Sequence, residues 1–176
     1  MRVSEIRKYF IDYHKANSKR NTLLNCERLL SQFCIDYGDR DIQSITSDEV
    51  LHFLTQVTEG TKQSTKRLRF SLLSAFFNFT RDTIDLDLHN PCDTPMLRKI
   101  FRAPKPNQWK ILDKDVIDEI IFRTIHPRNR ILLELMARGG MRVGEVLNLI
   151  PSDLDDCKII IRDPKSGKGV EVVFIP

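Results

Sequence analysis

The sequence predicts a mainly α-helical protein with two domains and a β-hairpin near its end. Three observations support this fold class. The first 90 of the 176 residues contain four segments with apolar residues at helical spacing. A basic stretch with four prolines then interrupts the pattern. Beyond it, two helical segments lead to two β-branched runs, and these runs flank a glycine-containing turn.

The four helical segments of residues 1–90 predict a compact helical bundle. Asn21 or Thr22 is the candidate N-cap of the second helix. The third helix begins with a capping box, because Glu49 follows Thr46 by three residues. The fourth helix should span about 61–81. The residues that we expect to face inward on it are Leu68, Leu72, Ala75, Phe76 and Phe79.

Residues 91–112 are expected to form a basic linker between domains 1–90 and 113–176. Their five basic groups outnumber the single carboxylate of Asp93 by four, which equals the net charge of +4 of the whole chain. A basic connection between two nearly neutral domains suits a polyanion that passes between them. An ordinary solvated linker is the alternative. The five basic residues are Arg98, Lys99, Arg102, Lys105 and Lys110.

The second domain is organised around residues 139–147. The apolar segment 131–137 predicts a helix that is buried on every side, and Gly139 and Gly140 should end it. Arg142 then lies in the first turn of a further helix. A cation there conflicts with the helix dipole unless an anion is bound at the same place. The residues that this further helix should bury are Val143, Val146, Leu147 and Ile150.

Composition restricts the class of protein. The sequence has no run of about eighteen apolar residues that could span a membrane, and its first residues lack the apolar core of a signal peptide. The four cysteines show no metal-ligand spacing, and Cys26 and Cys34 share an apolar helical face. We therefore expect a cytoplasmic, nucleoid-associated protein with reduced cysteines and with no metal or other cofactor.

The start of the fourth helix is a candidate DNA-binding surface. Lys62, Lys66 and Arg69 recur at i, i+4 and i+7, and Ser64 and Thr65 lie beside them. A basic, hydroxyl-rich stripe on one helix can contact phosphates and reach base edges in a major groove. A solvated helix face is the alternative interpretation. Further candidates for DNA contact are Lys19 and Arg20 before the second helix, and Arg102 and Lys105 in the linker.

Two motifs resemble the tyrosine recombinases, which include the phage integrases. They are Gly-Met-Arg-Val-Gly-Glu-Val-Leu at 140–147 and Pro-Lys-Ser-Gly-Lys-Gly at 164–169. The resemblance implies an N-terminal four-helix core-binding (SAM-like) domain, followed by a truncated α+β catalytic domain with a β-hairpin. It further implies double-stranded DNA as the partner, an oligomer of protomers on a recombination site, and strand cleavage through a 3′-phosphotyrosine without metal or cofactor.

The resemblance implies a catalytic role for three residues. Arg142 matches the first arginine that binds the scissile phosphate, and Glu145 matches an acidic position that supports it. Lys165 matches the hairpin lysine that protonates the leaving 5′-oxygen, with Lys168 as the alternative. A partly desolvated lysine near other cations can donate such a proton. Glu145 can equally be read as an i, i+3 partner of Arg142 on the helix surface.

The remaining catalytic groups of the family have no match here. No His-x-x-Arg occurs, and Tyr9, Tyr13 and Tyr37 all lie in the first domain. We therefore expect the chain to bind DNA without cleaving it, as part of a longer recombinase. The alternatives are a naturally short protein that occupies recombination sites, and a helical regulator unrelated to recombination. The target sequence and the direction of recombination do not follow from the sequence.

Overall fold

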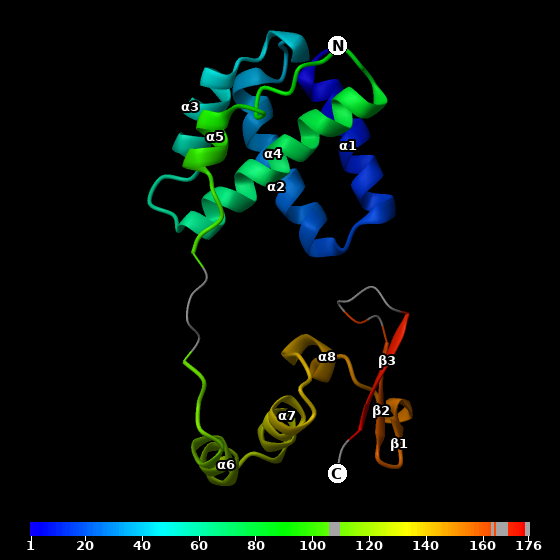
Figure 1. Cartoon of the computed structure of the whole chain (residues 1–176). Helices are drawn as coiled ribbons and strands as arrows, with labels where there is room; N and C mark the ends of the chain where they lie inside the picture. Colours follow the sequence, from blue (N-terminus) through cyan, green and yellow to red (C-terminus); the bar gives the residue numbers. More distant parts are fainter. Residues whose placement is uncertain (106–109, 163, 165–168, 175–176) are drawn as a thin grey trace. The chain divides into compact units, whose positions relative to one another are not determined.

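The computed structural model describes residues 1–105, 110–162, 164 and 169–174. The chain forms two compact units, Met1–Asn107 and Gln108–Pro176 (Figure 1).

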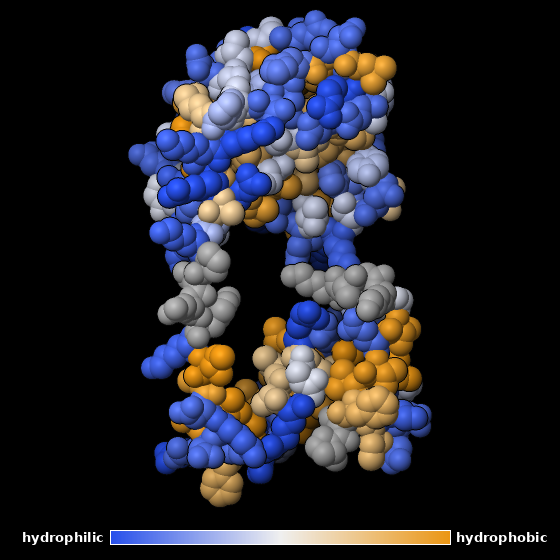
Figure 2. Space-filling model, viewed as in Figure 1, coloured by the Kyte–Doolittle hydropathy of each residue, from blue (hydrophilic) through white to orange (hydrophobic). Residues whose placement is uncertain are grey.

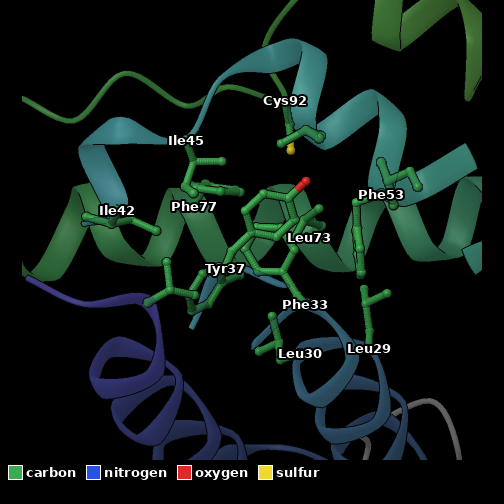
Figure 3. Packing of buried hydrophobic residues seen from close by; sticks show 14 of the residues in the cluster. Leu29, Leu30, Phe33, Tyr37, Ile42, Ile45, Phe53, Leu73, Phe77 and Cys92 are labelled. Carbon is green, nitrogen blue, oxygen red and sulfur yellow. The ribbon is translucent and has the colours of Figure 1, made fainter. Parts of the chain in front are cut away.

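The first unit is a helical bundle with one aromatic-rich core. The helix α4 packs against α1, α2 and α3. At the centre, the ring of Phe33 meets those of Phe53 and Phe77 edge-on, with centroids 4.9 and 6.1 Å apart (Figure 3). Such edge-to-face pairs add to the stabilisation that comes from burying apolar area. The elements are α1 (Val3–Asn17), α2 (Arg20–Tyr37), the 3₁₀ helix η1 (Ile42–Ser44), α3 (Ser47–Val57), α4 (Gln63–Thr83) and α5 (Pro95–Ile100).

The predicted helices of residues 1–90 are confirmed, and one of the two predicted caps is confirmed. The Thr46 hydroxyl accepts a hydrogen bond from the Glu49 backbone N–H at 3.3 Å, and the Glu49 carboxylate accepts one from the Thr46 N–H at 2.9 Å. The prediction of Asn21 or Thr22 as the cap of α2 is wrong. Lys19 occupies that position without a side-chain cap bond, because the helix already begins at Arg20.

The predicted inward face of α4 is only partly right. Phe76 is buried, and Leu72 and Phe79 pack against the core, whereas Leu68 and Ala75 are exposed. The helix is rotated so that Phe70, Leu73 and Phe77 are buried instead. Burial of two additional phenylalanine rings removes more apolar area from water than burial of Leu68 and Ala75 would.

The first unit continues beyond the predicted boundary at residue 90. Thr94 caps the short helix α5, and Pro95 occupies its first turn, where a proline is tolerated. Cys92, Leu97 and Phe101 are buried in the same core as the four long helices. The first half of the expected linker, 91–112, is therefore part of the helical unit. Pro95 signals a helix start rather than an irregular connection.

The second unit combines three helices with a small antiparallel sheet. Its elements are α6 (Lys114–Arg123), α7 (Pro127–Arg138), α8 (Val143–Leu147), the 3₁₀ helix η2 (Pro151–Asp153), β1 (Leu154–Asp155), β2 (Lys158–Arg162) and β3 (Val170–Phe174). The strand order is β1-β2-β3. The predicted hairpin is confirmed as β2 paired with β3, with Ile160 opposite Val172 and Arg162 opposite Val170.

The core of the second unit is small. Met141, Ile159 and Ile161 are buried, and Leu135 and Val173 pack against them. The prediction that segment 131–137 is buried on every side is wrong: α7 has no buried residue, and Ile131 is 60% exposed. Of the residues expected inward on α8, only Val146 packs against this core; Val143, Leu147 and Ile150 are exposed. Figure 2 shows apolar side chains on the visible surface of this unit.

Candidate nucleic-acid interface and phosphate site

The predicted basic stripe lies where α4 extends past the core of the first unit. Lys66 and Arg69 precede the core residues Leu73 and Phe76 by seven positions, so they continue the core-facing side of α4. This side faces α2, and an Arg69 guanidinium nitrogen lies 3.5 Å from the backbone oxygen of Asn25. Lys62 is exposed at the N-cap of α4. Among residues 1–105, none of the three cations pairs with a carboxylate.

The structure adds the start of α2 to this surface. Lys19 and Arg20 are exposed there. Asn25 is on the same helix, and the side-chain amide of Asn25 donates to the backbone oxygen of Asn21 at 2.9 Å. Ser64 is exposed and Thr65 is half-buried on α4. The resulting surface of α2 and α4 offers cations and hydroxyl groups on two packed helices.

Gln63 attaches the segment after α5 to the first turn of α4. The Gln63 side-chain amide donates to the backbone oxygens of Ile100 and Arg102, at 2.9 and 3.0 Å. Arg102 and Lys105 are exposed on this segment. Gln63 directly follows Lys62, so the backbone of Arg102 lies next to the start of the stripe, although Gln63 and Arg102 are 39 positions apart in the sequence.

Arg142 is the N-cap of α8, one position before the first turn that the sequence predicts. Gly140 has φ of +64°, in the left-handed region that glycine adopts without strain. The chain therefore leaves the helical conformation of α7 before it reaches Arg142. The Glu145 carboxylate accepts two hydrogen bonds, from the Arg142 backbone N–H and from its guanidinium, each at 2.8 Å. The Arg142 side chain is 61% exposed, whereas that of Glu145 is only 11% exposed.

Glu145 changes the expected electrostatics of this helix start. Its hydrogen bond raises the pKa of the Arg142 guanidinium above the ordinary value, and the charge of Glu171 on β3 adds to the effect. A carboxylate of the chain itself therefore offsets the cation at this helix start, and binding of an external anion by Arg142 stays a prediction. Within the described residues, the guanidinium atoms Nε and Nη2 have no acceptor, and these atoms remain available to a ligand.

An ion pair between the exposed Arg162 and the buried Asp153, which the residue pattern does not predict, connects the sheet to the segment after α8. The Arg162 guanidinium donates to the buried Asp153 carboxylate at 2.8 Å and to the Asn148 backbone oxygen at 3.3 Å. Asp153 also accepts from the Ile150 N–H at 2.9 Å. The sequence signal for this contact is Asp153, two residues after Pro151, because proline and aspartate at this spacing are typical of a turn.

The hairpin lysines Lys165 and Lys168 lie outside the described residues. Arg162 and Val170 form the described strand pair that is nearest to them in the sequence. Glu171, one residue into β3, is close enough to Arg142 to affect its pKa. Convergence of a hairpin lysine with Arg142 stays a prediction.

Other candidate groups can be placed as well. Tyr37 is buried and its hydroxyl donates to the Glu49 backbone oxygen at 3.4 Å, whereas Tyr9 and Tyr13 are exposed on α1. Within the described ranges, no cluster of three or more His, Cys, Asp or Glu side chains could hold a metal ion. None of the helices described here is both long and apolar enough to cross a bilayer.

Fold and site together define an integrase-type protein: a helical bundle followed by an α+β unit in which an arginine precedes a hairpin. Similar solved structures carry this fold. The Tn1549 transposon integrase in complex with transposon right end DNA has a TM-score of 0.73 and 21% identity, over 100% of this chain and 61% of that chain. A lambda integrase tetramer bound to a Holliday junction also has a TM-score of 0.73, with 18% identity over 100% and 51%.

Curated relatives agree with the structural neighbours. Tyrosine recombinase XerC of Roseiflexus castenholzii is 30% identical over 79% of this chain and 46% of its own length. XerC of Listeria innocua is 25% identical over 98% of this chain and 59% of its own. No family model matches the sequence. The chain belongs to the tyrosine recombinase and integrase family. It spans about half the length of the relatives that it matches.

Proposed function

We propose that this chain is the DNA-binding N-terminal portion of a site-specific tyrosine recombinase. The observation that carries the proposal is the basic surface of α2 and α4, where Lys62, Lys66 and Arg69 have no carboxylate partner among residues 1–105. Solved relatives of the same fold are complexes with DNA. Solved lambda integrase structures include a tetramer bound to a Holliday junction and a dimer bound to a core site, which supports an oligomer on DNA for the longer protein.

Arg142 is the residue that we assign to the scissile phosphate. A planar guanidinium binds two phosphate oxygens at once and stabilises the charge that develops on them in the transition state. Glu145 holds one edge of the guanidinium and leaves the other edge for the phosphate. Glu145 is therefore a positioning residue. Lys165 is our candidate for protonating the 5′-oxygen, with Lys168 as the alternative.

The chain of 176 residues should bind a duplex without cutting it. A tyrosine nucleophile has to reach the phosphate that Arg142 binds, and residues 113–176 contain no tyrosine. A protein that occupies recombination sites without cleaving them is the second candidate. In both cases the protein would act on the bacterial or phage chromosome, as a nucleoid-associated protein of the cytoplasm.

A salt-dependent binding measurement tests the role of the stripe. Replacement of Lys62, Lys66 and Arg69 by alanine should weaken duplex binding and make the salt dependence less steep, by about 0.9 in log–log slope for each lost phosphate contact. The affinity of the variant for duplex DNA is titrated at several salt concentrations.

The matched control removes the same number of charges elsewhere in the first unit. Arg2, Lys8 and Arg81 are suitable, because they lie on α1, before it, or near the end of α4. This control variant should keep nearly the full salt slope. If both variants lose affinity and slope equally, the stripe has no special role and is an ordinary solvated face.

A further inference from the structure

An open pocket of about 490 Å³ lies in the first unit on another side of α4. Its wall on α4 is formed by Arg67, Phe70, Ser74 and Asn78, at spacings of three and four residues along one face. The opposite wall comes from residues 92–93 and from α5 with the residues after it. Figure 1 shows α5 beside the first half of α4.

Hydrogen bonds and ring stacking hold both walls in place. The Asn90 amide donates to the Asn78 side-chain oxygen at 2.8 Å, and the Asn90 side-chain oxygen accepts from the Cys92 N–H at 2.8 Å. The rings of Phe70 and Phe101 stack with centroids 5.4 Å apart. The pocket is therefore formed by fixed elements before any ligand arrives, which reduces the entropic cost of binding.

Positive charge dominates this pocket. Arg67, Arg98 and Arg102 line it together with a single carboxylate, that of Asp93, so its formal charge is +2. Asp93 pairs with Arg98. The guanidinium of Arg67 lies over the Phe70 ring, with its central carbon 5.5 Å from the ring centroid. Among residues 1–105, Arg67 and Arg102 have no carboxylate partner. The Asn78 oxygen already accepts from Asn90, so its NH₂ group is the part that can serve a ligand, as a donor.

We propose that this pocket binds a phosphate group. Three guanidinium groups and an amide donor provide the fork-shaped, charge-assisted hydrogen bonds that tetrahedral oxyanions prefer. The site is distinct from the stripe of Lys62, Lys66 and Arg69, which continues the core-facing side of α4. The inference goes beyond duplex binding by that stripe and does not depend on it, because the probe is inorganic phosphate.

Titration of the 176-residue protein with inorganic phosphate tests the site. Side-chain and backbone ¹H–¹⁵N resonances are followed at constant ionic strength, with chloride as the balancing anion. Saturable shifts should appear at Arg67, Arg98 and Arg102. The double variant Arg67→Gln/Arg98→Gln should bind phosphate about tenfold more weakly, which corresponds to about 1.4 kcal/mol. The control double variant Arg2→Gln/Arg81→Gln should bind it as the unaltered chain does.

A second variant predicts a change in the opposite direction, which misfolding cannot imitate. Asp93→Asn removes the only carboxylate of the pocket and should tighten phosphate binding several-fold. Shifts that do not saturate, equal weakening in the control, or no gain with Asp93→Asn would each overturn the proposal.

The source of the phosphate is then assigned with duplex DNA. If the phosphate belongs to the DNA backbone, the Arg67→Gln/Arg98→Gln variant should lose affinity for a duplex, and inorganic phosphate should compete with the duplex. If the source is a small phosphorylated ligand, duplex affinity stays the same in this variant while phosphate binding is lost. Retained phosphate binding in this variant contradicts the site in either case.

Discussion

At the scale of single residues, burial separates the four free cysteines into two groups. Burial raises the pKa of the Cys92 thiol to about 12, and it also raises the pKa values of Cys26 and Cys34. The thiolate is the reactive form, so these three should react slowly with a disulfide reagent in the native protein. Cys157 is exposed and should react first.

Timed labelling followed by peptide mass spectrometry measures this order. One equivalent of reagent should be consumed quickly, at Cys157, and the other three only upon unfolding. The Cys157→Ser variant is the control and should remove the fast phase. Fast labelling of Cys92 in the folded protein would show that the loop around it opens readily.

The site at Arg142 shows what can be read from residue spacing and what cannot. Glu145 as an i, i+3 partner of Arg142 follows from the sequence alone, and the structure places the two in direct contact. The sequence does not reveal that the carboxylate also accepts the backbone N–H of the cap. Local spacing fixes which residues can meet, whereas the position of the helix start within one residue depends on packing and is less predictable.

At the scale of secondary-structure elements, the capping box of α3 is a measurable contribution to stability. Thr46→Ala removes the acceptor for the Glu49 N–H and should lower the free energy of unfolding by about 1 kcal/mol. The backbone N–H of Thr46, and then Arg40, hold the pKa of Glu49 below its ordinary value of 4.5. Its stabilising effect is therefore complete above pH 4.5 and is lost as the pH falls through the lower, folded-state value.

Denaturant titrations from pH 7 to pH 3 test this assignment. Glu49→Gln should lower stability at pH 7 and make stability less dependent on pH below 4.5. Asp48→Asn, at the neighbouring position of the same helix, is the matched control. An equal loss in both variants would indicate a general charge effect at the helix N-terminus rather than the specific capping bond.

The existence of elements was more predictable than the faces that they bury. Capping residues, prolines and glycines are local signals, and they located α3, α7 and the hairpin. The buried face of α4 depends on which rings pack best against α1, α2 and α3, and this information is spread over the whole bundle. For the same reason α5 was assigned to a linker, although Leu97 and Phe101 complete the core.

At the scale of the whole molecule, the positions of the tyrosines predict the outcome of a cleavage assay. A suicide DNA substrate traps any protein that forms a phosphotyrosine bond. The chain should give no covalent adduct on a denaturing gel, because Tyr9, Tyr13 and Tyr37 all belong to the first unit. Any covalent adduct would contradict this prediction, and its loss in the Tyr9→Phe, Tyr13→Phe or Tyr37→Phe variant would identify the tyrosine that forms it.

The two units should also differ in local stability. Among the described residues, 22 form one buried core in the first unit, whereas three form the buried core of the second. The second unit also exposes large apolar side chains on α6 and β3, among them Phe122 and Phe174. Since buried apolar area supplies most of the stabilisation, its backbone amides should open more easily. Native-state hydrogen exchange should show slow amides in α2 and α4 and faster exchange throughout α6, α7 and β3.

The Phe77→Ala variant is the internal control. It should lower the free energy of opening in α2 and α4 by roughly 3–5 kcal/mol, as expected for a deleted core phenylalanine, and so speed exchange there. Exchange in α6 and α7 should stay unchanged. Equal protection of both units would mean that the exposed apolar surface of the second unit is covered in solution.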